Sequence, residues 1–286
     1  MDLCNINHVK ALLSRHGFHF SKSLGQNFLI QRWVPEDIAA SSGATKEHGV
    51  MEIGPGIGPL TVELAKRAGK VVSLELDRTL LPILDETLAE YDNTKVVFGD
   101  VTKTDCADFV RTHLEGFRPM VCANLPYNIT TPVITQLLEC GCFEAITVMI
   151  QKEVAQRICA KPGTADYGAF TLLCQYYARC SYLFEVPKEC FLPAPKVTSA
   201  VVRLEVLEEP SVSTKDPELL FQVIRASFAQ RRKTLINGLS SAFGNRLSKE
   251  QLLGCMERAG LSATIRGERL SLHEFAMLAD ELHSAL

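Results

Sequence analysis

A glycine-rich turn after residue 50 constrains the fold more than any other feature of the sequence. An apolar run ends in Glu52-Ile53-Gly54-Pro55-Gly56-Ile57-Gly58, and a helical pattern begins directly after it. In the first turn of an open α/β sheet, such glycines let the backbone approach a bound nucleotide at the carboxyl end of a strand. A tight turn that binds nothing has the same signature. The motif therefore predicts an α/β sheet and leaves ligand binding open.

The sequence around this turn alternates between predicted strands and predicted helices, as in a parallel sheet. Between residues 48 and 150, short apolar runs alternate with helical patterns. A further helix is expected at 167–179, and further strands at 182–187 and 199–207. Strands that alternate with helices predict crossover connections and a parallel sheet that has helices on both faces.

The C-terminal part of the chain has a different pattern. Residues 208–217 are polar and bracketed by prolines, which is typical of a linker. Beyond them, apolar residues recur at helical spacing in four segments: 219–228, 235–243, 249–258 and 272–282. We expect a catalytic-type domain at 1–207 and a small all-helical domain at 218–286.

Composition excludes several classes of protein. With 47% hydrophobic and 22% charged residues, the chain of 286 residues is expected to be globular. The most apolar stretch, residues 133–150, contains Glu139 and Glu144, so no membrane span is expected. The opening segment lacks the features of a secretory signal, which predicts a cytoplasmic protein.

The positions of the cysteines indicate a protein of a reducing compartment that has no metal site. Most of the ten cysteines lie in apolar stretches, no CxxC pair occurs, and only Cys140 and Cys142 are close together. A zinc site needs two clusters of ligands at characteristic spacing, which the seven histidines do not supply. We expect reduced, packed thiols and no bound metal.

Charge is segregated along the chain although the net charge is only −3. Residues 1–35 contain four basic residues and one acid, and residues 219–249 contain six basic residues and no acid. An acidic body with basic flanks is typical of a protein that meets a polyanion on one face. A solvated surface explains the same pattern equally well.

Two carboxylates follow the next two predicted strands. Glu75 ends a strand run 21 residues after Gly54, where an acid can accept hydrogen bonds from a ribose diol. Asp100 ends the third run, where it can meet the edge of an adenine. Each carboxylate alone could be a helix cap or part of a surface turn. Their repetition at successive strand ends favours a nucleoside cofactor, either NAD or S-adenosylmethionine.

The fourth strand end favours S-adenosylmethionine. It reads Asn124-Leu125-Pro126-Tyr127, and no pattern for hydride transfer or pyrophosphate binding accompanies it. Amide and carbonyl oxygens accept hydrogen bonds from a planar amine, proline fixes the turn, and an aromatic ring stacks on a base. An Asx-type turn that closes a strand is the alternative.

With these motifs, the chain resembles the ribosomal RNA adenine dimethyltransferases of the KsgA type, which are class I S-adenosylmethionine-dependent methyltransferases with a Rossmann-like sheet. The resemblance covers almost the whole chain. Besides the strand-end motifs, it is carried by the segments at 24–29, 151–155, 166–168, 191–197 and 228–235.

The resemblance implies roles for individual residues. Contacts to S-adenosylmethionine are implied for Asn27, Leu29, Gly54, Gly56, Glu75, Asp100 and Asn124. Binding of the target adenine is implied for Asn124, Leu125, Pro126, Tyr127 and Phe191. Without the family, Phe191 would be interpreted as a core aromatic. Contacts to the RNA backbone are expected for the basic residues Lys22, Arg225, Arg231, Arg232 and Lys233.

The implied activity is N6,N6-dimethylation of two adjacent adenosines in a hairpin near the 3′ end of small-subunit (16S) ribosomal RNA. The expected partner is an assembling 30S subunit, and the protein is expected to be a monomer. Two alternatives stay open. One is a methyltransferase of the erythromycin-resistance type, which modifies large-subunit RNA. The other is a ribosome assembly factor without catalytic activity.

Overall fold

The computed structural model describes residues 2–21 and 24–286, which form two compact units. Unit 1 comprises Met1–Ala155 and Arg179–Val206, apart from the residues outside the described ranges. Unit 2 comprises Gln156–Ala178 and Leu207–Leu286. No helix of the described residues is long and apolar enough to cross a bilayer.

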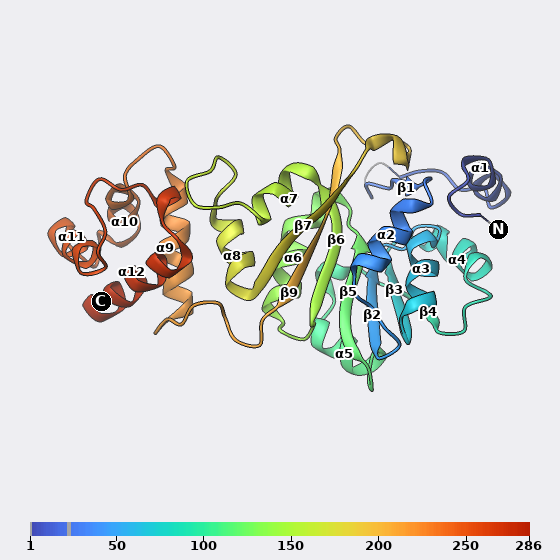
Figure 1. Ribbon diagram of the computed structural model, residues 1–286, viewed down its shortest axis with the longest axis horizontal. Helices are drawn as coiled ribbons and strands as arrows, with labels where there is room; N and C mark the ends of the chain where they lie inside the picture. The colour runs from blue at the N-terminus through green and yellow to red at the C-terminus, as the bar shows by residue number, and fades with distance from the viewer. Residues whose placement is uncertain (1, 22–23) are drawn as a thin grey trace. The chain divides into compact units, whose positions relative to one another are not determined.

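Unit 1 is built around a seven-stranded sheet (Figure 1). The strand order is β4 (Thr94–Phe98), β3 (Lys70–Glu75), β2 (His48–Ile53), β5 (Arg118–Asn124), β6 (Ala145–Gln151), β9 (Ser199–Val206) and β7 (Ala178–Val186). The first five strands are parallel, and β9 runs antiparallel to β6. The predicted Rossmann-like sheet is confirmed. Its strand order reverses between β2 and β5, where open α/β sheets bind ligands.

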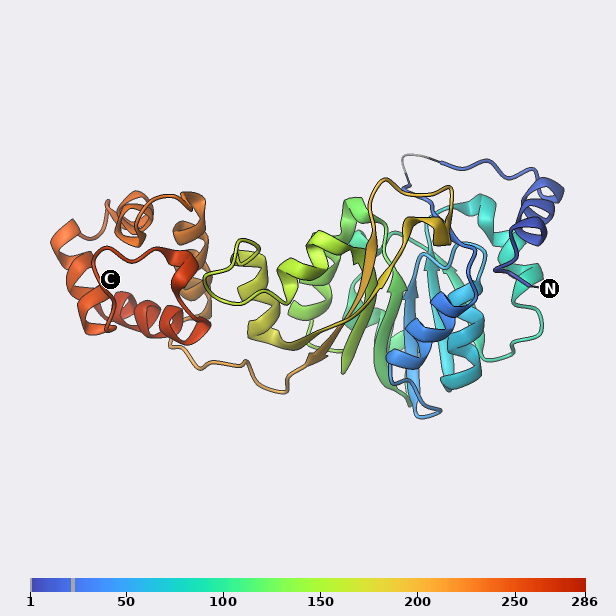
Figure 2. The same ribbon diagram turned by 45° about the horizontal axis from the view of Figure 1, so that its top comes forward.

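Helices cover both faces of this sheet (Figures 1 and 2). On one face, α2 (Trp33–Ser41) and α3 (Pro59–Arg67) share a hydrophobic cluster with Val50, Val71 and Cys122. On the other face lie α5 (Cys106–His113) and α6 (Thr130–Glu139). Every residue of β2 is buried, as expected for a central strand that is covered on both sides.

Short elements complete unit 1. The helix α1 (Ile6–Arg15) begins after Asn5, whose side chain caps it, and buries Val9 and Leu12 in a cluster that includes Leu84 of α4 (Leu81–Thr87). β1 (Phe28–Leu29) pairs antiparallel with β8 (Phe191–Leu192). One-turn 3-10 helices follow several strands: η1 (Arg78–Leu80), η2 (Val101–Lys103), η3 (Tyr127–Ile129) and η4 (Lys188–Cys190).

Unit 2 is helical, as predicted for the C-terminal region. Its elements are α8 (Ala169–Tyr177), α9 (Pro217–Ala229), α10 (Leu235–Phe243), α11 (Lys249–Arg258), η5 (Gly267–Arg269) and α12 (Leu272–Ala285), with α7 (Lys152–Ile158) spanning the junction between the units. Capping boxes start α11 and α12. Gly238 allows close contact of α10 with α9, because a Cβ there would lie 2.5 Å from the Ala226 carbonyl oxygen.

Residues 156–178 belong to a different unit from the one that the sequence predicted. The expected catalytic domain at 1–207 included residues 156–178, but the structure places them in unit 2. Tyr167, Leu172 and Tyr176 are buried in the core of unit 2, and the Tyr167 hydroxyl donates a hydrogen bond to the Leu270 carbonyl at 2.8 Å. Helical periodicity shows that a helix has an apolar face, but it does not show which core covers that face.

Candidate active site

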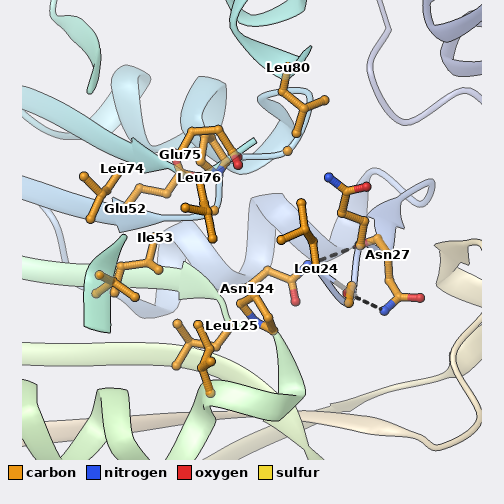
Figure 3. A pocket seen from close by; sticks show the side chains of 18 of the residues that line it. Leu24, Asn27, Glu52, Ile53, Leu74, Glu75, Leu76, Leu80, Asn124 and Leu125 are labelled. Atoms are coloured by element: carbon orange, nitrogen blue, oxygen red, sulfur yellow. Dashed lines mark hydrogen bonds between the residues drawn. The ribbon is translucent and has the colours of Figure 1, made fainter. Parts of the chain in front are cut away.

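A cavity of about 290 Å³ opens where the strand order of the sheet reverses (Figure 3). The segments that follow β2, β3, β4 and β5 line it, together with residues 24–29. These segments bring together ten of the predicted site residues: Asn27, Leu29, Gly54, Gly56, Glu75, Asp100, Asn124, Leu125, Pro126 and Tyr127. These predicted residues therefore line one cavity, although Asn27 and Tyr127 are 100 positions apart in the sequence.

The glycine turn after β2 adopts a conformation that other residues rarely adopt. Gly54, Gly56 and Gly58 have φ angles of 67°, 61° and 95°. A Cβ at Gly56 would lie 3.1 Å from the Phe28 ring, whereas a Cβ at Gly54 would meet open space. Gly54 is thus required by its backbone conformation, and Gly56 also by its close approach to β1.

Glu75 places a carboxyl group on the cavity wall at the end of β3. Its Oε1 accepts a hydrogen bond from the Asp77 backbone N–H at 2.7 Å. Burial raises the pKa of the Glu75 carboxyl, although backbone N–H groups of Asp77, Leu76 and Gly56 act in the opposite direction. A carboxylate offers about four acceptor positions, so Glu75 retains capacity for a ribose diol.

Asp100 lies at the corresponding position after β4 and also caps η2. Its Oδ1 accepts hydrogen bonds from the Thr102 backbone N–H at 2.9 Å and the Thr102 hydroxyl at 2.7 Å. These hydrogen bonds hold the pKa of Asp100 below its ordinary value. Asp100 therefore lines the cavity as an ionised acceptor and also serves as a cap, which was the alternative interpretation.

Apolar side chains next to the strand-end residues also line the cavity, and the sequence motifs did not single them out. Ile53 precedes Gly54, Leu76 follows Glu75, and Val101 follows Asp100, and all three line the cavity. Leu76 is 45% exposed on the cavity wall, where its side chain can contact a planar ring. Each of them is adjacent in sequence to a predicted strand-end residue, and this adjacency could have predicted their place on the cavity wall. The glycine turn, the buried acid and the apolar wall together fit a nucleoside.

Asn124 ends β5 at the centre of the cavity wall (Figure 3). Its Nδ2 donates a hydrogen bond to the Asn27 carbonyl at 3.4 Å, so its Oδ1 is left to accept one. The Leu125 N–H is already used, because it donates to the Met149 carbonyl at 3.1 Å. Asn124 is thus oriented as an acceptor for an amine.

Tyr127 starts η3 and is anchored by a residue that the sequence analysis did not identify. Its hydroxyl and the hydroxyl of Ser199 are 2.7 Å apart. Ser199 is the first residue of β9 and is fully buried. Burial raises the pKa of the Tyr127 phenol, so the ring is neutral at physiological pH. Ser199 could be found only from this contact across 72 residues.

The segment at 24–29 closes one side of the cavity and is held at both ends. Gln26 donates from its Nε2 to the Asp77 carboxylate at 2.7 Å and accepts from the Ser21 N–H at 2.9 Å. Leu29 pairs with Phe191 in the ladder between β1 and β8. Gln26 therefore attaches the segment to the turn after β3, next to Glu75, and Leu29 attaches it to β8.

Phe191 is the one predicted adenine-binding residue that does not line the cavity. It is 3% exposed and lies next to the cavity-lining Leu29, so its contact with an adenine stays a prediction. It belongs to the hydrophobic cluster of α2 and α3, as a core aromatic does. Its pairing with Leu29 in the short ladder between β1 and β8 accounts for its burial.

The predicted RNA contacts have different surroundings in the structure. Lys22 lies outside the described residues. Arg231 has structural partners within unit 2, because its Nη2 donates to the carbonyls of Ala165 at 2.8 Å and Tyr167 at 3.1 Å. Arg225, Arg232 and Lys233 are exposed. Arg231 is exposed as well, but its guanidinium is engaged by these carbonyls, so Arg225, Arg232 and Lys233 are better placed to bind a polyanion.

Glu52 is a buried carboxyl at the start of the glycine turn, and it also lines the cavity (Figure 3). It is 1% exposed, and its Oε2 accepts hydrogen bonds from the hydroxyls of Thr61 and Ser73, each at 2.6 Å. Burial raises the pKa of Glu52 from 4.5 to about 7, although the two hydroxyls lower it. These hydrogen bonds connect β2, β3 and α3 at the cavity wall.

This pKa shift implies a pH-dependent stability. Glu52 holds its proton more tightly in the folded protein than in the unfolded chain. Its contribution to the free energy of unfolding is therefore complete below pH 4.5 and is lost as the pH rises to about 7. We expect Glu52→Gln, which keeps the volume and the hydrogen bonds, to remove this loss. The unfolding free energy of the variant relative to the parent should rise by about 3 kcal/mol between pH 4.5 and about 8 in chemical denaturation. Glu139→Gln, at an exposed carboxyl, is the control, and equal slopes for parent and Glu52→Gln would contradict the assignment.

Comparisons with known proteins identify relatives over nearly the whole chain. The family model described as ribosomal RNA adenine dimethylase matches residues 17–272. The ribosomal RNA small subunit methyltransferase A of Geobacillus thermodenitrificans is 46% identical over 284 residues, which cover 98% of this chain and 97% of the relative.

Two solved structures are also similar. A dimethyladenosine transferase from Plasmodium falciparum has a TM-score of 0.76 at 25% identity and covers 90% of this chain and 98% of its own. The 23S rRNA methyltransferase ErmE has a TM-score of 0.69 at 26% identity and covers 90% of this chain and 100% of its own. Both structures extend over nearly the whole chain, as the sequence resemblance does.

Proposed function

The chain belongs to the ribosomal RNA adenine dimethylase family, and from this premise we propose that it dimethylates adenosine at N6 in small-subunit ribosomal RNA. The target is two adjacent adenosines in a hairpin near the 3′ end of that RNA, within an assembling subunit in the cytoplasm. The observation that carries the proposal is the position of Asn124 in one cavity with Glu75, Asp100 and the glycine turn.

We infer that the cavity binds S-adenosylmethionine, which supplies an electrophilic methyl group when bound. Glu75 is suited to accept from the ribose hydroxyls, Asp100 to meet the adenine edge, and Leu76 to contact the adenine face. The open space beside Gly54 leaves room for the rest of the molecule. Among the described residues, no group of three or more His, Cys, Asp or Glu side chains could hold a metal ion.

Asn124 and Leu125 hold the target amine in this proposal. The lone pair of an adenine amine is delocalised into the ring, which makes the nitrogen a poor nucleophile. Hydrogen bonds from the amine to the Asn124 Oδ1 and the Leu125 carbonyl favour a pyramidal nitrogen with a localised lone pair. Alignment of a nucleophile with its target contributes roughly 7–11 kcal/mol in effective molarity, so no strong base is needed.

Tyr127 provides a face on which the adenine can stack. The hydrogen bond with Ser199 fixes the Tyr127 hydroxyl, and the ring belongs to the cavity wall. Stacking on an aromatic ring contributes about 1–3 kcal/mol per base. This contribution offsets part of the cost of a few kcal/mol for taking an adenine out of its stack.

Substrate choice tests the proposal against its alternatives. The purified protein is incubated with labelled S-adenosylmethionine and either small subunits that lack the modification or large-subunit RNA. Label in the small subunits alone supports the proposal. Label in large-subunit RNA alone would assign the chain an activity like that named for ErmE, and tight subunit binding without label would indicate an assembly factor.

The exposed cations of unit 2 are proposed to bind the RNA backbone. Each phosphate contact adds about 0.7–0.9 to the slope of log affinity against log salt. We expect Arg232→Ala with Lys233→Ala to reduce this slope by about 1.5 and to weaken RNA binding roughly tenfold at moderate salt. Fluorescence anisotropy across a salt series measures both quantities.

A matched variant removes the same charge from cations that already have partners. Arg258 and Arg266 form ion pairs with Glu281 and Glu268, so Arg258→Ala with Arg266→Ala should leave the slope nearly unchanged. An equal loss of slope in both double variants would show a general effect of net charge, and would contradict an RNA contact at Arg232 and Lys233.

A further inference from the structure

Three cysteines meet outside the cavity, where α6 ends and α5 begins. Cys106 is the first residue of α5, Cys140 caps the end of α6, and Cys142 follows two residues later. The Sγ atoms of Cys140 and Cys142 are 3.0 Å apart. The Gln136 amide donates to the Cys106 Sγ at 3.5 Å, and none of the three cysteines lines the cavity.

The backbone between Cys140 and Cys142 is shaped to keep their thiols together. Gly141 has a φ of 63°, a conformation that residues with a side chain rarely adopt. A Cβ at this position would meet open space, so the requirement for glycine comes from the backbone alone. The Cys-Gly-Cys segment therefore forms a turn with both sulfur atoms on the same side.

The pair is also accessible and chemically suited to oxidation. Cys140 and Cys142 are half-buried, whereas Cys106 is buried. Hydrogen bonds from the thiols of Cys106 and Cys142 lower the pKa of Cys140, which favours the reactive thiolate. The described cysteines, histidines and acids contain no group of three or more that could hold a metal ion, so their geometry does not support a metal site here.

We propose that Cys140 and Cys142 form an oxidant-sensitive pair that hydrogen peroxide converts into an intramolecular disulfide. In the first step, a thiolate of the pair attacks one peroxide oxygen, the O–O bond breaks, and a sulfenic acid and water form. In the second step, the other thiol attacks the sulfenic sulfur, the S–S bond forms, and a second water leaves. Two thiols are oxidised and one peroxide is reduced. The proposal does not depend on the methyltransferase function.

Peptide mapping without reduction tests the proposal on the folded, full-length protein. After treatment with about one equivalent of peroxide and alkylation of the remaining thiols, the peptide with Cys140 and Cys142 should carry a disulfide and weigh about 2 Da less than its reduced form. Cys4 and Cys159 are internal references, because they are also half-buried and burial raises their pKa to about 12 and about 11. The pair should react at least about tenfold faster than these references.

Variants decide between the possible partners. Cys140→Ser and Cys142→Ser should each abolish the disulfide, whereas Cys106→Ser and the control Cys159→Ser should keep it. A disulfide that survives in Cys142→Ser and disappears in Cys106→Ser would overturn the assignment of the pair. Loss of the Cys140 and Cys142 thiols no faster than those of Cys4 and Cys159 would overturn the proposal as a whole.

Discussion

Asn124→Ala is expected to lower kcat for methyl transfer by about 10²–10³-fold, the usual cost of losing one hydrogen-bonding group aimed at the reacting atoms. The amide oxygen of Asn124 is oriented by the hydrogen bond from its Nδ2 to Asn27. Alanine removes the acceptor that localises the amine lone pair, but it leaves the glycine turn and Glu75 in place. Single-turnover transfer of labelled methyl groups to small subunits measures this loss separately from binding.

Asn128→Ala provides a matched control for this variant. Asn128 is an exposed asparagine on the same cavity wall, four residues after Asn124. Its loss should change kcat by less than about threefold, because surface substitutions usually cost little. A rate for Asn124→Ala as high as that for Asn128→Ala would show that Asn124 does not hold the target amine.

Glu75→Ala is expected to weaken the binding of S-adenosylmethionine by about 100-fold. Two hydrogen bonds from a ribose diol to a carboxylate contribute about 1.5 kcal/mol each, and 1.4 kcal/mol corresponds to a factor of ten in affinity. Glu75 is buried on the cavity wall at the end of β3, where a ribose diol would reach its carboxylate. Isothermal titration calorimetry with the cofactor gives the dissociation constant directly.

Glu75→Gln separates the loss of the carboxylate from the loss of packing. Glutamine keeps the volume and one acceptor, and we expect roughly tenfold weaker binding. Glu63→Gln, on α3 and outside this cavity, should bind the cofactor as the parent does. Parental affinity in Glu75→Ala, at an unchanged melting temperature, would contradict the assigned role of Glu75.

The sequence predicted the parts of the site that lie at strand ends. The glycine turn, Glu75, Asp100 and Asn124 each follow an apolar run, and a parallel sheet brings the carboxyl ends of its strands to one edge. Local pattern and topology are sufficient for such residues. The same reasoning extends to Ile53 and Leu76, which are adjacent in sequence to Gly54 and Glu75.

Residues that act through long-range contacts could not be predicted in this way. Ser199 reaches Tyr127 across 72 residues, and Gln26 reaches Asp77 across 51 residues. Similarly, the charge of Arg231 is visible in the sequence, but the carbonyls of Ala165 and Tyr167 that bind it are not. Pairing between elements determines these roles, and no local pattern encodes that pairing.

Phe191 and the helix α8 show the limits of composition and resemblance. The resemblance implies an adenine contact for Phe191, and the structure adds that Phe191 packs in the hydrophobic cluster of α2 and α3. The apolar face of α8 has the same periodicity whichever unit it packs on, and Tyr167, Leu172 and Tyr176 are buried in unit 2. An apolar role for Phe191 and the helix α8 could be predicted from the sequence, but the residues that pack against them could not.

The identity of the methylated nucleoside tests the central claim most directly. Small subunits that lack the modification are incubated with the protein and S-adenosylmethionine, and their RNA is digested to nucleosides for mass spectrometry. We expect N6,N6-dimethyladenosine at two adjacent positions of one hairpin near the 3′ end, and its absence in the reaction with Asn124→Ala. Methyl groups on another base, or on a ribose, would contradict the role of the Asn124-Leu125-Pro126-Tyr127 segment as a binding site for the adenine amine.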